Sequence, residues 1–352
     1  MKNIKYIIFT VVLLSACKKT NHLPEKENNV YVYVVGNSYA VGTGHQMALY
    51  FKNGKFIDLK GSRAMAICLQ DTNVYIAGAS DLSYTAYWKN GIVTNIHIND
   101  ISSYASASSI AVSGTDVYVG GVQDAGGVGY ELYPTHEVYW KNGVMSNELH
   151  LDLPGKIDIT NCSIAVDGAD LYVAGTGTSI YKNDRVLTGI YWKNNHPVYL
   201  GFPGSTLSRI VSGMTVSGGI VYCVGEVEGG SGFAATYWKN TTPIRLDTAA
   251  TGAVASCIAV SGSDVYVGGL IYEDQGPTAY YWKNGVRHKV ADNAHINSIA
   301  VDGSDVYCAG YVDLPNNTTM GAYWKNGAPE SLTGTPANLF SSEFTGIAVG
   351  HH

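Results

Sequence analysis

One short phrase, an aromatic pair followed by Lys-Asn, occurs seven times along this chain. It reads Tyr-Phe-Lys-Asn-Gly in the first copy, and every later copy begins Tyr-Trp-Lys-Asn. The copies start at Tyr50, Tyr87, Tyr139, Tyr191, Tyr237, Tyr281 and Tyr323. Neighbouring copies are therefore 37 residues (50 to 87) to 52 residues (87 to 139) apart. A period of this size predicts an array of one supersecondary unit, in which each unit covers the apolar face of the next.

A second phrase precedes each of the last six copies and supplies the other half of the unit. A clear version, Ser-Ile-Ala-Val-Asp-Gly-Ser-Asp-Val-Tyr-Cys-Ala-Gly, runs from 298 to 310. The apolar run Ile-Ala-Val predicts a first strand, the Gly a tight turn, and the β-branched and aromatic Val-Tyr a second strand. Tyr-Trp predicts a third strand, and Asn-Gly, whose residues accept positive φ, predicts a hairpin into a fourth. Four strands in every 40 to 50 residues or so are the blade of a β-propeller.

The ends of the repeat region predict how the ring closes. Residues 28 to 36 read as a second strand with no first strand before them. Residues 345 to 350 read as a first strand with no second strand after them. The last strand of the chain therefore supplies the innermost strand of the first blade, which removes the exposed edges of an open array. We predict an all-β fold, a seven-bladed propeller of four-stranded blades, with almost no helix after residue 28.

The four-strand order and phrases such as the one at 298 to 310 resemble those of NHL-type and YVTN-type propellers. The Tyr-Trp-Lys-Asn-Gly phrase resembles that of repeat lipoproteins of Bacteroidota. The resemblance covers about residues 28 to 350 and implies a fold but no activity, because propellers of this kind include enzymes, lectins and scaffolds. The Asp-box of sialidases, Ser-x-Asp-x-Gly-x-x-Trp, does not occur in the sequence.

The first residues read as a leader. Lys2 and Lys5 precede an apolar run from Ile7 to Leu14, which is too short to span a bilayer. It ends in Leu-Ser-Ala-Cys, which resembles the lipobox of bacterial lipoproteins, so Cys17 is the predicted lipidation site. We expect a signal peptide over 1–17, a flexible polar tether over 18–28 and one propeller over 29–352. The expected location is the outer membrane, by the lipid anchor only, facing either the periplasm or the cell surface.

Charge and cysteine usage exclude some classes of partner. The net charge of −6 gives no broad attraction to nucleic acid. Five cysteines remain after the leader, an odd number with no Cys-x-x-Cys pair. Cys223 and Cys308 occupy a position that is Val in other repeats, so we interpret them as buried apolar residues. We expect no disulfide, no metal site and no cofactor.

The two faces of the predicted ring differ. One carries the short, repeated turns, each with a Lys before the Asn. These are Lys52, Lys89, Lys141, Lys193, Lys239, Lys283 and Lys325. Asp residues at the start of the second strands should neutralise them locally, so we do not expect a polyanion-binding ring there. The aromatic residues of the repeats should pack between blades rather than bind sugars.

The opposite face carries loops of varied length and composition, as recognition surfaces do. We predict the loops between second and third strands at 37–46, 122–137, 175–189, 226–233, 270–278 and 311–321. The candidate ligand-binding residues on this face are Arg63, Tyr104, Tyr130, His136, Arg209, Glu273 and His295. A metal site from Asp124, Glu131 and His136 matches no known ligand spacing.

These observations leave three functional hypotheses. The first is a non-catalytic binding module at the cell envelope that recognises a glycan or a protein through the variable face. The second is a polysaccharide lyase in which His136 or His295 acts with Tyr and Arg on the same face. The third is a structural scaffold in an envelope complex. Scattered candidate side chains with no local motif favour the first over an enzyme.

Overall fold

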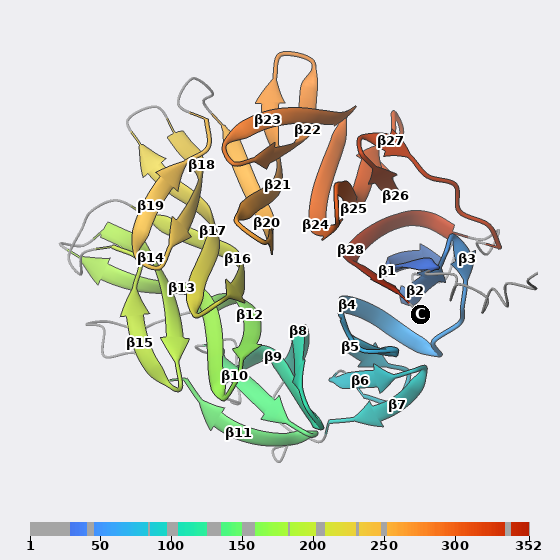
Figure 1. The fold of residues 1–352 in the computed structure, drawn as a ribbon, viewed down its shortest axis with the longest axis horizontal. Helices are drawn as coiled ribbons and strands as arrows, with labels where there is room; N and C mark the ends of the chain where they lie inside the picture. The colour runs from blue at the N-terminus through green and yellow to red at the C-terminus, as the bar shows by residue number, and fades with distance from the viewer. Residues whose placement is uncertain are drawn as a thin grey trace, which may run out of the picture.

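The computed structural model describes residues 29–40, 46–83, 85–96, 105–124, 135–149, 159–181, 184–201, 208–229, 232–247, 252–334 and 339–351. Within these residues the chain forms seven four-stranded antiparallel sheets and no helix. Figure 1 shows the sheets arranged as blades around a central axis. The fold is the predicted seven-bladed propeller. We number the blades by chain order from the one that contains β1.

Each blade is a simple meander from the innermost to the outermost strand. Blade one consists of β28 (Leu339–His351), β1 (Val30–Ala40), β2 (Gln46–Lys52) and β3 (Lys55–Phe56). Blade two consists of β4 (Gly61–Gln70), β5 (Asn73–Ser80), β6 (Ala86–Lys89) and β7 (Ile92–Asn95). Blade three consists of β8 (Ala105–Ser113), β9 (Asp116–Asp124), β10 (Thr135–Lys141) and β11 (Val144–Glu148). Blade four consists of β12 (Ile159–Asp167), β13 (Asp170–Tyr181), β14 (Asp184–Lys193) and β15 (His196–Tyr199).

The remaining blades repeat this order. Blade five consists of β16 (Arg209–Ser217), β17 (Ile220–Gly229), β18 (Gly232–Lys239) and β19 (Thr242–Arg245). Blade six consists of β20 (Ala253–Ser261), β21 (Asp264–Glu273), β22 (Gly276–Lys283) and β23 (Val286–Asp292). Blade seven consists of β24 (Ala294–Asp302), β25 (Asp305–Asp313), β26 (Thr319–Lys325) and β27 (Ala328–Pro329).

Blade one is closed by the end of the chain on both of its edges. On the inner edge β28 pairs with β1 from Val30 opposite His351 to Ala40 opposite Leu339. On the outer edge Thr333 forms a parallel bridge with Lys55 of β3. Its amide donates to the carbonyl of Gly54 at 2.7 Å, and its carbonyl accepts from the amide of Phe56 at 3.1 Å. The predicted closure is confirmed, and the outer contact adds a second connection between chain end and chain start.

The repeated Lys-Asn step is explained by the turn into the fourth strand. In every blade the Asn has positive φ, 48° at Asn53 and 50° at Asn284, for example, as Asn tolerates better than most residues. Its side-chain oxygen also accepts a hydrogen bond from the first paired amide of the second strand, at 2.9 Å from Val265 to Asn284. The Asn therefore fixes both the turn and the neighbouring strand.

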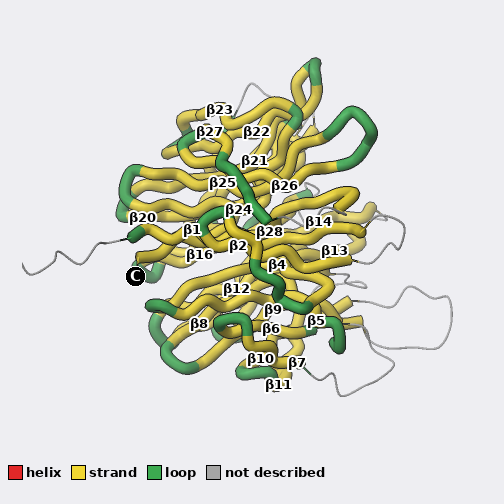
Figure 2. Tube along the Cα trace, turned by 90° about the vertical axis from the view of Figure 1, so that its right-hand side faces the viewer, coloured by secondary structure: helices red, strands yellow, loops and turns green. Residues whose placement is uncertain are grey.

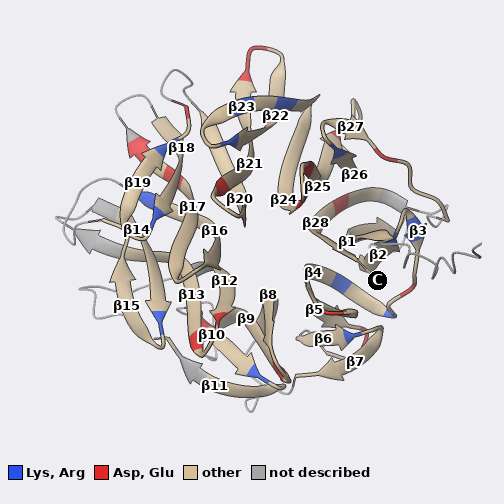
Figure 3. Cartoon of the chain, in the orientation of Figure 1, with Lys and Arg blue, Asp and Glu red and all other residues tan. Residues whose placement is uncertain are grey.

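The Lys of this step is neutralised as predicted in four blades. The ion pairs are Lys141–Asp116, Lys193–Asp170, Lys283–Asp264 and Lys325–Asp305, with N–O distances of 2.7 to 2.9 Å. Each ammonium also lies 5.2 to 5.4 Å from the centre of a Tyr ring on the second strand. Figure 3 shows that basic and acidic residues are distributed around the whole ring.

Blades pack through aromatic residues and hydrogen bonds of the innermost strands. The Trp of each later phrase is buried, as is Phe51 of the first. A bulge in the innermost strand turns one polar side chain toward the next blade. Thr345 donates to the carbonyl of Ala64 at 2.8 Å, and Asn297 donates to that of Phe344 at 2.8 Å. These bonds join blade one to blade two and blade seven to blade one.

Two further features bear on the predictions. The five cysteines are free, and all lie buried or half-buried.

Several predicted loops are shorter than expected, because the second and third strands continue to pair beyond the repeated phrase. The predicted loop 175–189 is a hairpin in which β13 and β14 pair as far as Tyr181 and Asp184.

Candidate functional site

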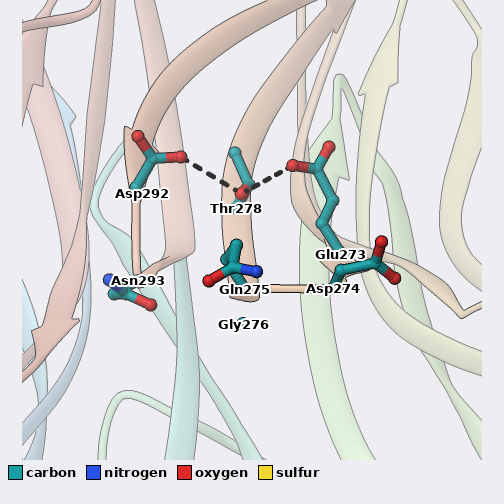
Figure 4. Close-up of a pocket in the computed structure, with 7 residues that line it drawn as sticks. All are labelled: Glu273, Asp274, Gln275, Gly276, Thr278, Asp292 and Asn293. Carbon is teal, nitrogen blue, oxygen red and sulfur yellow. Dashed lines mark hydrogen bonds between the residues drawn. The ribbon is translucent and has the colours of Figure 1, made fainter.

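A pocket of about 510 Å³ opens on the variable face at blade six. It is lined by Glu273, Asp274, Gln275, Gly276, Thr278, Asp292 and Asn293. Two connections shape it: Asp274 and Gln275 join β21 to β22, and Asn293 alone joins β23 to β24. Its volume is in the range of small-ligand sites. Figure 4 shows the two walls, with Glu273 on one side and Asp292 on the other.

Backbone conformation keeps the two connections close together. Gly276 has a φ of 120°, and a side chain there would meet Asn293 Oδ1 at 2.7 Å. Asn293 itself has a φ of 48°, which lets the chain turn within one residue. Gly276 and Asn293 are therefore the residues that allow the pocket to form between neighbouring turns.

Hydrogen bonds hold the two carboxylates at the walls. The hydroxyl of Thr278 lies 3.1 Å from Glu273 Oε2 and 3.3 Å from Asp292 Oδ1, between the two side chains (Figure 4). Tyr280 donates to Glu273 Oε1 at 2.8 Å, and Lys289 lies 2.6 Å from Asp292 Oδ1. The ammonium of Lys289 lowers the pKa of Asp292. The pocket therefore presents ordered carboxylate oxygens as hydrogen-bond acceptors.

A second polar cluster lies beside the pocket on blade seven. His295 of β24 stacks on Tyr311 of β25, with ring centres 4.4 Å apart. His295 Nε2 lies 3.1 Å from Asp313 Oδ2. The amide of Asp313 donates to the carbonyl of Asn293 at 2.8 Å, which links this cluster to the pocket wall.

Titratable groups from three blades lie near Tyr311. Burial, followed by the nearby Glu343, Asp313 and Tyr272, raises its pKa to about 12. Tyr272 belongs to blade six, next to Glu273 in the sequence, and 57% of its surface is exposed. Tyr311 is therefore a neutral phenol at physiological pH. Side chains alternate along β21, so the exposed ring of Tyr272 lies on the side of blade six that faces blade seven, opposite to Glu273.

Of the four candidate residues whose side chains the structure describes, Glu273 and His295 lie near each other on neighbouring blades. Glu273 lines the pocket, and His295 lies two residues beyond Asn293 of its wall. Arg63 is on β4 of blade two, and Arg209 is on β16 of blade five. The guanidinium of Arg209 packs against Gly201, where a side chain would lie 2.5 Å from it, and burial lowers its pKa.

Three candidates fall where the structure gives no side-chain account. Tyr104 and Tyr130 lie outside the described residues, and His136 is placed only by its backbone on β10. Of the hypothetical metal set, Glu131 is outside the described residues and Asp124 is described only by its backbone. Elsewhere in the described ranges, no group of three or more His, Cys, Asp and Glu side chains could hold a metal ion.

Several site residues were missed by the sequence analysis. Thr278 was predicted to end the loop 270–278, Tyr280 fell in the third strand of blade six, and Asp292 and Asn293 belonged to no predicted feature. Tyr311 marked only the start of a predicted loop. One feature of the sequence could have indicated the pocket. Asn293 is the single residue between the fourth strand of blade six and the first strand of blade seven, and so short a connection lies close to the neighbouring turn.

Comparisons with known proteins add evidence on the fold. No protein-family model and no curated protein matches the chain. It is similar to the acylaminoacyl peptidase of Pyrococcus horikoshii, with 12% identity and a TM-score of 0.55 over 87% of this chain and 51% of that one. It is also similar to a puromycin-hydrolysing peptidase of Mycobacterium tuberculosis, with 10% identity and a TM-score of 0.51 over 86% and 54%. The chain spans about half the length of these peptidases, and the likeness shows the propeller fold alone.

Proposed function

We propose that this protein is a non-catalytic binding module, anchored at the cell envelope through Cys17, that binds a glycan in the pocket of blade six. The observation that carries the proposal is the pair of fixed carboxylates, Glu273 and Asp292, on either side of Thr278. Carboxylate and hydroxyl oxygens are suitable partners for the hydroxyl groups of a sugar.

The charge of the pocket narrows the class of glycan. Glu273, Asp274 and Asp292 are all acidic, and among the described residues Lys289 alone forms an ion pair with one of them. An anionic polymer would meet like charge at this site. The pocket therefore favours neutral or amino sugars over uronic acids.

The same observations weaken the lyase alternative. A uronate lyase needs a cation beside its base to neutralise the substrate carboxylate. The described partners of His295 are Tyr311 and Asp313, and the two candidate arginines are on other blades. A binding role needs no such arrangement.

The location of the protein is a separate part of the proposal. It rests on the charged start, the short apolar run and the Leu-Ser-Ala-Cys phrase that ends at Cys17. Within the described residues, no helix has the length and apolar character to cross a membrane. An acylated Cys17 would attach the chain, because each buried CH₂ contributes roughly 0.8 kcal/mol.

A glycan-array screen of the protein, with mass spectrometry of every bound glycan, tests the binding role. We expect binding of neutral or amino glycans without cleavage. Asp292→Asn or Glu273→Gln should weaken binding about 10- to 100-fold, the loss of one hydrogen bond to a charged group. Glu330→Gln, on an exposed residue of the outer rim, is the matched control and should bind normally. Unsaturated products, or equal binding by all variants, would contradict the proposal.

A further inference from the structure

The described chain begins on the face of the repeated turns. Val30 starts β1 and pairs with His351, the last residue of β28. The amide of Val32 donates to Oδ1 of Asn53 in the turn of blade one at 2.8 Å. Figure 2 shows the C-terminus at the left edge of the propeller, among the turns between strands. We call this side, which carries the Lys-Asn turns, the turn face.

The pocket lies at the other end of the strands. β21 runs from Asp264, which pairs with Lys283 at the turn face, to Glu273 in the pocket wall. Its 10 residues rise about 33 Å at roughly 3.3 Å per residue. The pocket is therefore separated from the chain entry by the height of the propeller.

The length of chain before β1 limits how the propeller sits over an anchor. From Cys17 to Asn29 there are 12 steps (29 − 17), which reach about 40 Å when fully extended. A flexible chain of this length, as the sequence predicts, spans about 20 Å on average. If the bilayer lay at the variable face, the segment between Cys17 and Asn29 would have to cross the outer strands β2 and β3, about 10 Å. It would then have to run along the blade for the strand height of about 33 Å. That path uses the whole extended length.

We propose that the turn face is the membrane-facing side of this protein and that the pocket of blade six is displayed away from the bilayer. This inference rests on the lipid anchor in the proposed function. The partner of the turn face is the headgroup surface of the bilayer.

The charges of the turn face fit this partner. Four of its lysines form ion pairs with Asp residues, and each pair has no net charge. The four paired carboxylates therefore do not repel anionic lipids. Lys52, Lys89 and Lys239 form no salt bridge within the described part of the chain. Lys52 lies 4.5 Å from the ring centre of Tyr31, and Lys89 lies 5.4 Å from that of Tyr75. Asp71, Asp167 and Asp302 at the same turns offset these three positive charges, so the face is close to neutral and can approach lipid headgroups without strong repulsion.

Resonance energy transfer to an acceptor on the lipid headgroups, measured from a donor at either end of β5, tests which face of the propeller is nearer to the bilayer. Thr72 and Leu82 are exposed and flank β5, whose 8 residues rise about 26 Å. Thr72→Cys marks the turn face and Leu82→Cys the variable face. Each full-length lipidated variant is labelled with a thiol-reactive donor and reconstituted into phosphatidylethanolamine–phosphatidylglycerol vesicles that carry a headgroup acceptor. Wild-type protein is the blank, because its free cysteines are buried or half-buried.

We expect higher transfer efficiency from position 72 than from position 82. Equal or reversed efficiencies would overturn the orientation, and so would failure of the full chain to float with the vesicles. Glycan binding measured on the same labelled proteins keeps the two proposals distinguishable. If glycan binding is absent but energy transfer is higher from position 72, only the proposed glycan binding is contradicted. If glycan binding is normal but energy transfer is higher from position 82, only the proposed orientation is contradicted.

Discussion

Glu137 is a buried acid whose ionisation should oppose folding. Its side chain is 0% exposed, and neither of its carboxyl oxygens has a hydrogen-bond partner. Burial raises its pKa well above 4.5. Glu137 lies close to the thiol of Cys162 on β12, at the junction of blades three and four. The folded protein therefore keeps Glu137 protonated at pH values where the unfolded chain ionises it.

This difference gives the stability a defined pH dependence. Between pH 4.5 and the raised pKa, the unfolded state binds fewer protons than the folded state, so stability falls as pH rises. Over that window the free energy of unfolding falls by about 1.4 kcal/mol per pH unit relative to a side chain that does not titrate. Glu137→Gln removes the titration and keeps nearly the same shape.

Urea denaturation from pH 4.5 to 7.5 measures this effect. The Gln variant should gain stability over the wild type as pH rises, and the gain should level off above the pKa of the folded state. Glu330→Gln, on the exposed rim, is the control and should run parallel to the wild type. Parallel profiles for Glu137→Gln and the wild type would show that Glu137 is ionised in the native state, and the reasoning from burial would be wrong.

Three other substitutions or treatments test the packing. Thr345→Val removes the hydroxyl that joins blades one and two, and should lower the free energy of unfolding by about 1 kcal/mol in urea titrations. Asn284→Ala loses the bond to Val265 and places a Cβ residue at a φ of 50°, so it should destabilise more than Asn284→Gly in the same assay. The free cysteines should react with a thiol reagent only as the protein unfolds, because burial raises the pKa of residues such as Cys223.

Repeated residues made the fold predictable. Each structural requirement of a blade, such as the positive φ at Asn284 or the buried aromatic residue at Trp282, appears in every copy with the same spacing. The closure was predictable because the unmatched strands at 28–36 and 345–350 complete each other. The outer bridge at Thr333 was not, because an isolated pair of backbone hydrogen bonds leaves no pattern in the sequence.

The site was harder to predict because it depends on one connection that does not repeat. Glu273 and Asp292 are 19 positions apart in the sequence (292 − 273), and both reach Thr278 because β21, β22 and β23 are neighbouring strands in which Thr278 pairs with Asp292. His295 finds its partner Asp313 through strand pairing, not through a local motif. Charged residues in the predicted loops gave no indication of which ones would meet.

One position shows how a departure from the repeat reports a local property. Six blades have Ala, Thr or Gly three residues before the Trp or Phe of the repeated phrase, and blade three has Glu137 at this position. At the equivalent Gly321 an added side chain would lie 3.1 Å from Phe344 of the next blade. A small residue is therefore needed where the next blade is bulky. The pattern of strands and loops predicts Glu137 at the end of the variable loop 122–137. Its burial is indicated by the small residues that the other blades have at the same position.

The two faces of the propeller have different chemistry because only one of them repeats. At the turn face the repeated polar groups bind one another: Asn284 accepts from the backbone amide of Val265 and donates to the carboxylate of Asp264, and Lys283 pairs with the same carboxylate. At the variable face no such requirement recurs, and the pocket keeps carboxylate oxygens that serve no turn. Selective recognition needs groups that are ordered but not fully satisfied. Glu273 and Asp292 meet that condition, which is why a search for the ligand should begin at blade six.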